Sequence, residues 1–191
     1  APKENSADLR TRGYEISLSW RDSFNLAGKE FSYNVSGSIS DYDSHITRYA
    51  NNPNRSLTDY YVGQEIGEIW GFVVDGLFQT DEEAKYYQEN VCDALTYVGT
   101  NRMQGGFLAG DLRYVDLDNV PNPDTGYNQI TLGKNTVDDP GDRKLLGNSL
   151  PSFMYGINLG FNWMGFDVSA FFQGVGNHYF YPPGMNIAFW G

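Results

Sequence analysis

Apolar residues alternate with small or polar residues along the segment 153–176. In its first half, aromatic and aliphatic side chains occupy the odd positions, and Gly or Asn occupies nearly all even ones. A period of two residues predicts a β-strand with one apolar and one polar face. The second half repeats the pattern from Phe166, with Phe171 as the exception, after a turn at Met164 and Gly165. The segment therefore predicts a transmembrane β-hairpin with a polar inner face.

A second hairpin is predicted over residues 13–40. Apolar residues from Tyr14 to Trp20 and from Phe31 to Ile39 alternate with polar ones, and the second polar series is almost all serine. The polar tract 22–30 is expected to turn the chain between the two strands. A serine face makes a poor protein core, but it suits the wall of a water-filled lumen.

The two hairpins bracket residues 41–152, which make a connection of roughly 110 residues, far longer than ordinary connections between strands. Short turns at one end and a long excursion at the other are typical of outer-membrane barrels, whose turns face the periplasm. The sequence therefore predicts an all-β fold with minor α-helix in loops, forming part of a transmembrane antiparallel β-barrel. Residues 13–40 and 153–176 would be barrel hairpins, 41–152 a large extracellular loop region, and 177–191 the start of the next extracellular loop.

Two local elements are predicted inside the excursion. The apolar run 65–78 predicts short strands that meet in a type I′ turn at Asp75 and Gly76. Thr80 followed by Glu83 forms a capping-box pattern, which predicts a short helix ending near Asn90.

Composition changes this picture little. Aromatic residues make up 16% of the 191 residues, which fits aromatic girdles at two membrane interfaces. No apolar stretch is long enough for a helical span, and the mean hydropathy of -0.48 does not exclude alternating strands. A net charge of -11 argues against nucleic acid or an anionic membrane surface as partner. The single cysteine excludes an intramolecular disulfide, and the N-terminus lacks the pattern of a signal peptide.

Acidic residues in the excursion are candidate ligands for a hard cation. Closely spaced carboxylates are the ligands that calcium prefers. The candidate metal ligands are Asp116, Asp118, Asp138 and Asp142. Turns in which Asp and Asn bond their own backbone explain the same pattern equally well. No catalytic motif is present, so the chain is not expected to be an enzyme, and calcium is the one candidate cofactor.

Tyrosines in the excursion are candidate contact residues for a sugar ring or a protein partner. The candidates are Tyr42, Tyr49, Tyr60 and Tyr61. The alternative is that such tyrosines form a small core of the loop region itself. The neighbouring Trp70 is expected to belong to that core.

Three blocks of sequence resemble, in order, the late barrel region of SusC/RagA-type TonB-dependent outer-membrane transporters. The blocks are EIGEIWGFVVDGLFQTDEEA, GDLRYVDLDN and VDDPGDRKLLGNSLPSFMYGINLGFNWMGFDVSAFFQGVGN, and the resemblance covers about Arg10 to Tyr181. The stretch PNPDTGYNQITLGKN looks like an insertion in the family's compact Asp-rich loop. On this resemblance the chain is a fragment from the C-terminal part of the barrel.

The resemblance implies a barrel of about 22 strands, closed by a plug domain, in the bacterial outer membrane. It implies nutrient import: an oligosaccharide or peptide substrate, a SusD-like surface lipoprotein as lid, and energy supplied through TonB. Membrane lipids are then a further partner, and nucleic acid is not. The competing interpretation is a secreted, soluble β-rich carbohydrate-binding module with the aromatics as a sugar platform. A hydrolase that uses two loop carboxylates is a third.

Overall fold

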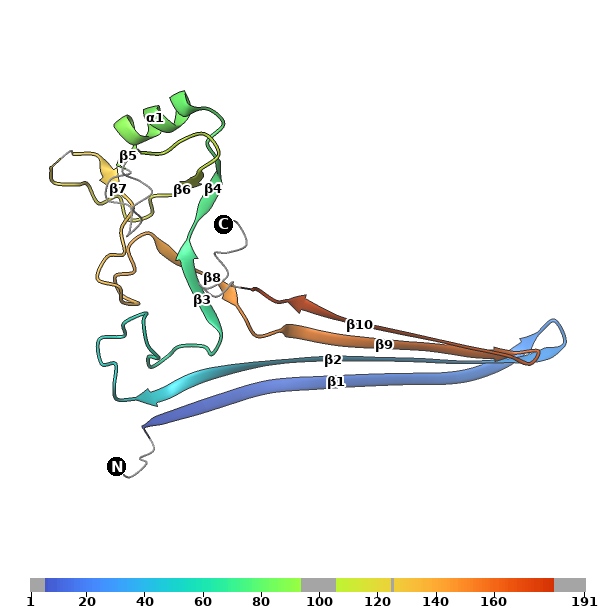
Figure 1. Cartoon of the computed structure of the whole chain (residues 1–191). Helices are drawn as coiled ribbons and strands as arrows, with labels where there is room; N and C mark the ends of the chain where they lie inside the picture. The colour runs from blue at the N-terminus through green and yellow to red at the C-terminus, as the bar shows by residue number, and fades with distance from the viewer. Residues whose placement is uncertain (1–5, 94–105, 125, 181–191) are drawn as a thin grey trace, which may run out of the picture. The chain divides into compact units, whose positions relative to one another are not determined.

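Four long strands form one sheet in the computed structural model, which describes residues 6–93, 106–124 and 126–180. The sheet order is β1-β2-β9-β10, so that two chain-adjacent hairpins lie side by side (Figure 1). The strands are β1 (Ala7–Leu26), β2 (Lys29–Tyr49), β9 (Ser152–Trp163) and β10 (Phe166–Asn177). The mainly antiparallel β-structure confirms the predicted all-β class. No helix in the part of the chain described here is long and apolar enough to cross a membrane.

Two-residue turns close both hairpins. Ala27 and Gly28 have φ angles of 52° and 77°, and Met164 and Gly165 have 51° and 82°. Positive φ at both central residues is the type I′ geometry, which matches the right-handed twist of the flanking strands. The second turn lies where the sequence predicts it. The first lies deep in the polar tract, because β1 continues to Leu26.

Contacts divide the chain into two units. Among the described residues, the sheet unit comprises 9–47, 65–68 and 147–180, and the loop unit comprises 6–8, 48–64, 69–93, 106–124 and 126–146. The remaining elements are short: β3 (Glu68–Phe72), β4 (Val74–Leu77), α1 (Asp81–Asn90), β5 (Cys92–Asp93), β6 (Leu112–Tyr114), β7 (Asn128–Gln129) and β8 (Arg143–Asn148). They pair two by two, β3 with β8, β4 with β6, and β5 with β7.

The predicted hairpin with a turn at Asp75 and Gly76 is wrong. Both residues lie inside β4, which pairs with β6, whereas β3 pairs with β8. A register shift between Val74 and Gly76 marks a bulge, and Gly76 has a φ of 156°. The Asp-Gly pair therefore forms part of a β-bulge. The same dipeptide is also typical of hairpin turns, so the sequence alone does not distinguish the two structures.

The predicted helix is confirmed as α1, with Thr80 as its N-cap. The Thr80 hydroxyl accepts a hydrogen bond from the Glu83 amide at 3.1 Å, and the Glu83 carboxylate accepts one from the Gln79 amide at 2.8 Å. The first bond satisfies an amide of the first helical turn, and the second satisfies the amide of the residue that precedes the cap. A small core of Phe78, Ala84 and Phe107, with Tyr87 packed against it, holds the helix.

Candidate functional site

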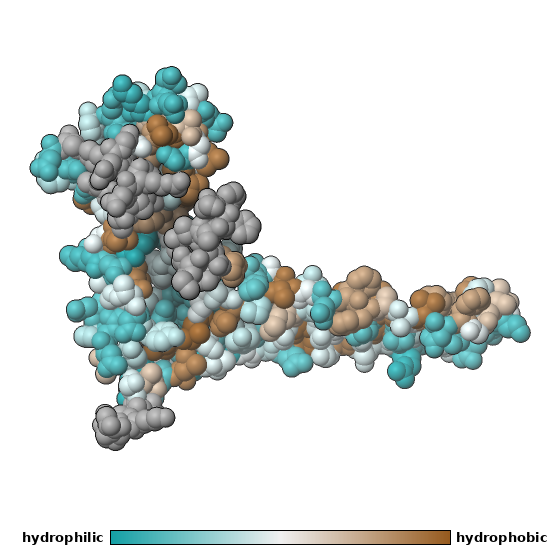
Figure 2. Space-filling view, viewed as in Figure 1, coloured by the Kyte–Doolittle hydropathy of each residue, from teal (hydrophilic) through white to brown (hydrophobic). Residues whose placement is uncertain are grey.

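One face of the four-stranded sheet is apolar and exposed. On β1 this face carries Tyr14, Ile16, Leu18 and Trp20, and Leu18 is 75% exposed. On the neighbouring strands it carries Tyr33, Val35 and Ile39, then Ile157, Leu159 and Phe161, then Val168 and Phe172. Apolar (brown) side chains are visible on the sheet in Figure 2. An exposed apolar face of this extent indicates contact with a membrane or another apolar partner.

The opposite face is polar at corresponding levels of the strands. Asn162 lies opposite Ser32 and Asp167, Asn158 lies opposite Ser36 and Phe171, and Gly156 lies opposite Ser38 and Gln173. A shallow hollow on this face is lined by residues that include Arg21, Ser32, Asn34, Asn162 and Asp167. Hydroxyl and amide groups of this kind are suited to a water-filled interior.

Phe171, the one residue that departs from the alternation, covers a glycine on the polar face. A Cβ atom placed at Gly156 would lie 3.4 Å from Cε2 of Phe171 and 3.5 Å from the Ser38 hydroxyl. The ring therefore packs beside Gly156 at ordinary van der Waals distance, as aromatic residues often do beside strand glycines. Sequence alternation detects the exception but not this cause.

Aromatic rings gather on the apolar face near the two hairpin turns. The ring centroid of Phe31 lies 5.1 Å from that of Phe24 and 5.5 Å from that of Phe161. The Trp20 indole donates a hydrogen bond to the Tyr33 hydroxyl at 3.2 Å. Phe24, Phe31 and Phe161 thus form an aromatic cluster at this end of the sheet, as in the girdles of outer-membrane barrels, whereas Trp20 lies farther along β1.

At the other end of the strands, the regular ladder between β2 and β9 runs as far as Ser40 and Met154. The next β9 residue, Phe153, has a positive φ of 52°, and its amide donates to the Asp41 carboxylate at 3.3 Å. The same carboxylate oxygen accepts the Tyr42 amide at 2.9 Å. Asp41 thus replaces ladder hydrogen bonds at the point where the apolar face ends.

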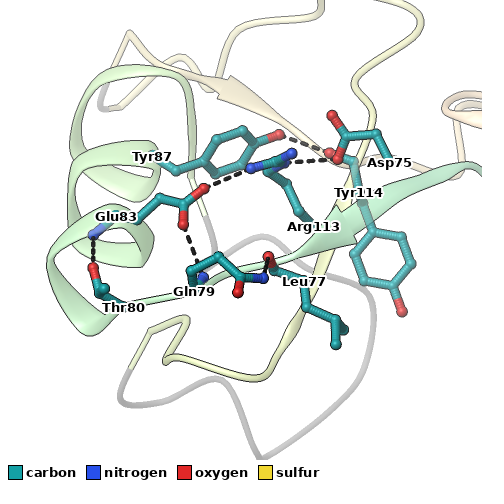
Figure 3. Close-up of polar contacts among 8 residues, drawn as sticks. All are labelled: Asp75, Leu77, Gln79, Thr80, Glu83, Tyr87, Arg113 and Tyr114. Atoms are coloured by element: carbon teal, nitrogen blue, oxygen red, sulfur yellow. Dashed lines mark hydrogen bonds and ion pairs between the residues drawn. The ribbon is translucent and has the colours of Figure 1, made fainter.

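In the loop unit, Arg113 joins β6 to β4 and α1 (Figure 3). Its guanidinium donates to Asp75 at 2.7 Å and to Glu83 at 2.6 Å. The hydrogen bond to Asp75 is the main cause that raises the pKa of Arg113 above its ordinary value. The Tyr87 hydroxyl, also on α1, donates to the Tyr114 carbonyl at 2.7 Å. Because these groups bond one another, they position the helix and offer no acid–base pair.

Three of the four candidate metal ligands lie together. Carboxylate oxygens of Asp116, Asp118 and Asp142 all lie within 4.8 Å of one another. Asp138 is elsewhere and forms an ion pair with Arg55 at 3.1 Å. One oxygen of Asp116, Oδ2, is buried and has no hydrogen-bond partner among the described residues.

Asp142 has a structural role that the sequence does not reveal. Its side chain is fully buried, with 0% exposure, and its Oδ1 accepts the amides of Leu117 at 2.6 Å and Asp118 at 3.2 Å. Its Oδ2 accepts the Thr131 amide at 2.5 Å. The carboxylate therefore ties together two loop segments that lack regular secondary structure.

The four candidate contact tyrosines have different environments. Tyr61 is buried, accepts a hydrogen bond from the Trp70 indole at 3.3 Å, and lies beneath the Arg55 guanidinium. Tyr60 is 55% exposed and packs edge to face against Tyr49. Tyr42 is exposed as well. The surface thus presents Tyr60 and Tyr42, whereas Tyr61 is part of the interior of the loop unit.

A two-faced antiparallel sheet with aromatic residues at one end, together with a loop unit, defines an all-β chain. No family model matches the sequence. Two curated relatives, both from Formosa agariphila, are "TonB-dependent receptor P39" and "TonB-dependent receptor P3". The first is 23% identical over 180 residues, covering 90% of this chain and 17% of the relative. The second is 21% identical over 182 residues, covering 89% of this chain and 15% of the relative.

The chain is therefore similar to one part of TonB-dependent receptors. It spans about one sixth of the length of the curated relatives it matches. Both similarities extend over about nine tenths of this chain, so they include the sheet unit and the loop unit together.

Proposed function

We propose that this chain forms part of the barrel wall of an outer-membrane TonB-dependent transporter and performs no chemistry of its own. The observation that carries the proposal is the two-faced sheet of β1, β2, β9 and β10. Apolar side chains on β2 extend from Phe31 to Ile39, and their partners on β9 extend from Trp163 to Tyr155. Nine residues tilted by about 40° rise roughly 23 Å, which is close to the apolar band of roughly 25 Å on outer-membrane barrels.

In this proposal residues 41–152 form an extracellular region, and residues 13–40 and 153–176 cross the membrane. The aromatic cluster at the short turns marks the periplasmic interface. Polar side chains such as Ser36 and Asn158 would line the lumen. The long connection between β2 and β9 supports this orientation, because the long loops of outer-membrane barrels face outward.

The finer function that we propose is uptake of an oligosaccharide or peptide. A SusD-like surface lipoprotein would cover the extracellular mouth, and TonB would act on another part of the receptor. The resemblance of three sequence blocks to SusC/RagA-type transporters supports this assignment. The contact residues that we propose for substrate or lid are Tyr42, Tyr49 and Tyr60. Tyr42 and Tyr60 are exposed, and Tyr49 is partly buried beside Tyr60.

Cysteine labelling on intact cells tests the orientation. In the full-length receptor, with Cys92 replaced by Ser, Lys134→Cys and Lys29→Cys supply matched sites. Lys134 lies in the loop unit with its side chain 82% exposed, and Lys29 follows the β1–β2 turn. A membrane-impermeant maleimide is expected to label the first site on intact cells and the second only after the outer membrane is permeabilised. Recovery of the receptor from the soluble fraction without detergent would instead support a soluble binding module.

We also propose that the cluster of Asp116, Asp118 and Asp142 binds calcium. Three carboxylates lie within 4.8 Å of one another, and none forms an ion pair with a described residue. The unpartnered Oδ2 of Asp116 is the strongest support, because a buried carboxylate oxygen without a donor is unfavourable. A bound calcium would supply the missing partner without any change in the fold.

Calcium titration of the full-length receptor checks this proposal. Added calcium is expected to raise the melting temperature, and chelation is expected to reverse the rise. Asp116→Asn should abolish the calcium-dependent shift. Asp138→Asn is the matched control and should retain it, because Asp138 pairs with Arg55 outside the cluster. An equal shift in both variants would remove this site from consideration.

A further inference from the structure

Two arginines lie on the same face of β1 as its apolar residues, between Tyr14 and the N-terminal end of the strand. After Trp20, Leu18, Ile16 and Tyr14, the next positions of the same parity are Arg12 and Arg10. Both side chains are exposed, and neither forms an ion pair with a described residue. By contrast, Arg48, Arg55 and Arg113 are all paired with carboxylates. The unpaired arginines therefore lie at one edge of an exposed apolar surface.

Contacts between β1 and β2 establish which face the two arginines occupy. The Thr11 and Ser44 hydroxyls lie 2.7 Å apart, and a Cβ atom at Gly13 would lie 2.8 Å from Cβ of Tyr42. Odd positions of β1 therefore share the serine-lined face. The hydrogen bond from Trp20 to Tyr33 places even positions on the apolar face. Since side chains alternate along a strand, Arg12 and Arg10 project on the apolar side.

Acidic groups near the arginines on this face already have partners. The contact between Thr11 and Ser44 sets the register of the β1–β2 hairpin, and in this register Asp43 lies opposite Arg12 and His45 opposite Arg10. Oδ2 of Asp43 lies 2.9 Å from Nδ1 of His45. Asp41 accepts the amides of Tyr42 and Phe153. The two guanidinium groups are thus left to bind an anion that arrives from outside the chain.

We propose that Arg10 and Arg12 bind the phosphate of a lipid in the leaflet nearest this end of the strands. The inference rests on the proposed function, because it requires the apolar face to lie against a bilayer. Two residues of strand rise about 6–7 Å, so Arg12 lies one headgroup layer beyond Tyr14. Arginine is suited to this role because its planar fork binds phosphate oxygens through two parallel hydrogen bonds.

The acidity of the whole chain does not oppose this site. Charges in solution are screened over about 8 Å at physiological ionic strength, so the nearest groups decide the local potential. A net charge of -11 argues against attachment to a membrane by electrostatics alone. Here the apolar face would hold the sheet in the bilayer, and the two arginines would select the headgroup.

Lipid binding to the purified full-length receptor in detergent micelles tests the inference. The probe is bisphosphorylated lipid A, with its dephosphorylated form as the ligand control. The double variant Arg10→Gln/Arg12→Gln is expected to bind the phosphorylated form about 10- to 30-fold more weakly than the unmodified receptor. Arg10→Lys/Arg12→Lys should recover part of the loss. Arg21→Gln, on the polar face, is the matched control and should bind normally.

Each alternative result has a separate meaning. Equal binding by the double glutamine variant and the unmodified receptor would overturn the lipid site while leaving the membrane assignment intact. Full competition by inorganic phosphate at the lipid's own concentration would also overturn it, since the site would then bind free anions. A receptor that proves soluble without detergent would instead overturn the proposed function.

Discussion

Replacing Ile157 by arginine is expected to destabilise the membrane-embedded receptor by about 2–4 kcal/mol, whereas Asn158→Arg should cost less than about 1 kcal/mol. The two residues are neighbours on β9, and Ile157 shares a face with Leu159 and Phe161. An arginine there must place its charge in hydrocarbon. At Asn158 the side chain lies opposite Ser36 on the polar face and remains hydrated.

Equilibrium unfolding of the receptor in lipid vesicles measures both variants. Tryptophan fluorescence is a suitable signal, because Trp20 and Trp163 lie on strands of the sheet unit. Neither site is sterically closed, since Ile157 is 41% exposed and Asn158 is exposed as well. A difference in unfolding free energy between the two variants therefore shows whether each face of the sheet contacts lipid or water. Equal tolerance of both substitutions would contradict the assignment of the two faces.

The alternating pattern predicted the hairpins well because each strand carries its own two-faced signal. It did not predict how long β1 and β2 are. They extend to Ala7 and Tyr49, well beyond the predicted limits of residues 13 and 40. The added residues carry charged and polar side chains on both faces, so their strand conformation depends on pairing between β1 and β2. Pairing of this kind leaves no period of apolar residues to detect.

The prediction of a hairpin at Asp75 and Gly76 is wrong for a related reason. The Asp-Gly pair favours a local turn, but pairing of β4 with β6, which is distant in sequence, determines the structure of this segment. Asp75 bonds Arg113 at 2.7 Å across 38 positions of sequence, and β4 pairs with the strand that contains that arginine. The helix, in contrast, was predictable because its cap at Thr80 and Glu83 is wholly local.

The acidic site was only partly predictable. Sequence spacing grouped four aspartates, but Arg55, which lies 83 positions from Asp138, binds that residue and leaves a cluster of three. The burial of Tyr61 against Trp70 depends in the same way on the tertiary structure. Sequence can nominate carboxylates and tyrosines of the right type. Which of them meet is decided by contacts between segments that lack a periodic pattern.

Replacing Asp142 by alanine is expected to be the most damaging substitution in the loop unit, at about 3–5 kcal/mol. The carboxylate is fully buried and accepts the amides of Leu117, Asp118 and Thr131. A hydrogen bond to a charged group contributes about 1.5–3 kcal/mol, and a buried amide left without a partner costs about 1–3 kcal/mol. Asp138→Ala is the matched control, since its exposed ion pair with Arg55 should contribute about 1 kcal/mol or less.

Amide hydrogen exchange in the full-length receptor measures this effect locally, which matters because separate units need not unfold together. In Asp142→Ala the amides of Leu117, Asp118 and Thr131 should exchange more than about a hundredfold faster, and the amides of α1 should change little. Unchanged protection at these three amides would show that the carboxylate is dispensable.

The same variant separates structure from ligand binding at the acidic cluster. Asp142→Ala should open the loop with or without calcium, because its amide partners belong to the protein. Asp116→Asn should leave the amides protected in the absence of calcium, since Oδ2 of Asp116 accepts no hydrogen bond from a described residue. It should lose only the additional protection that calcium gives. If Asp116→Asn instead opens the loop without calcium, Asp116 stabilises the loop directly and calcium is not needed to explain its position.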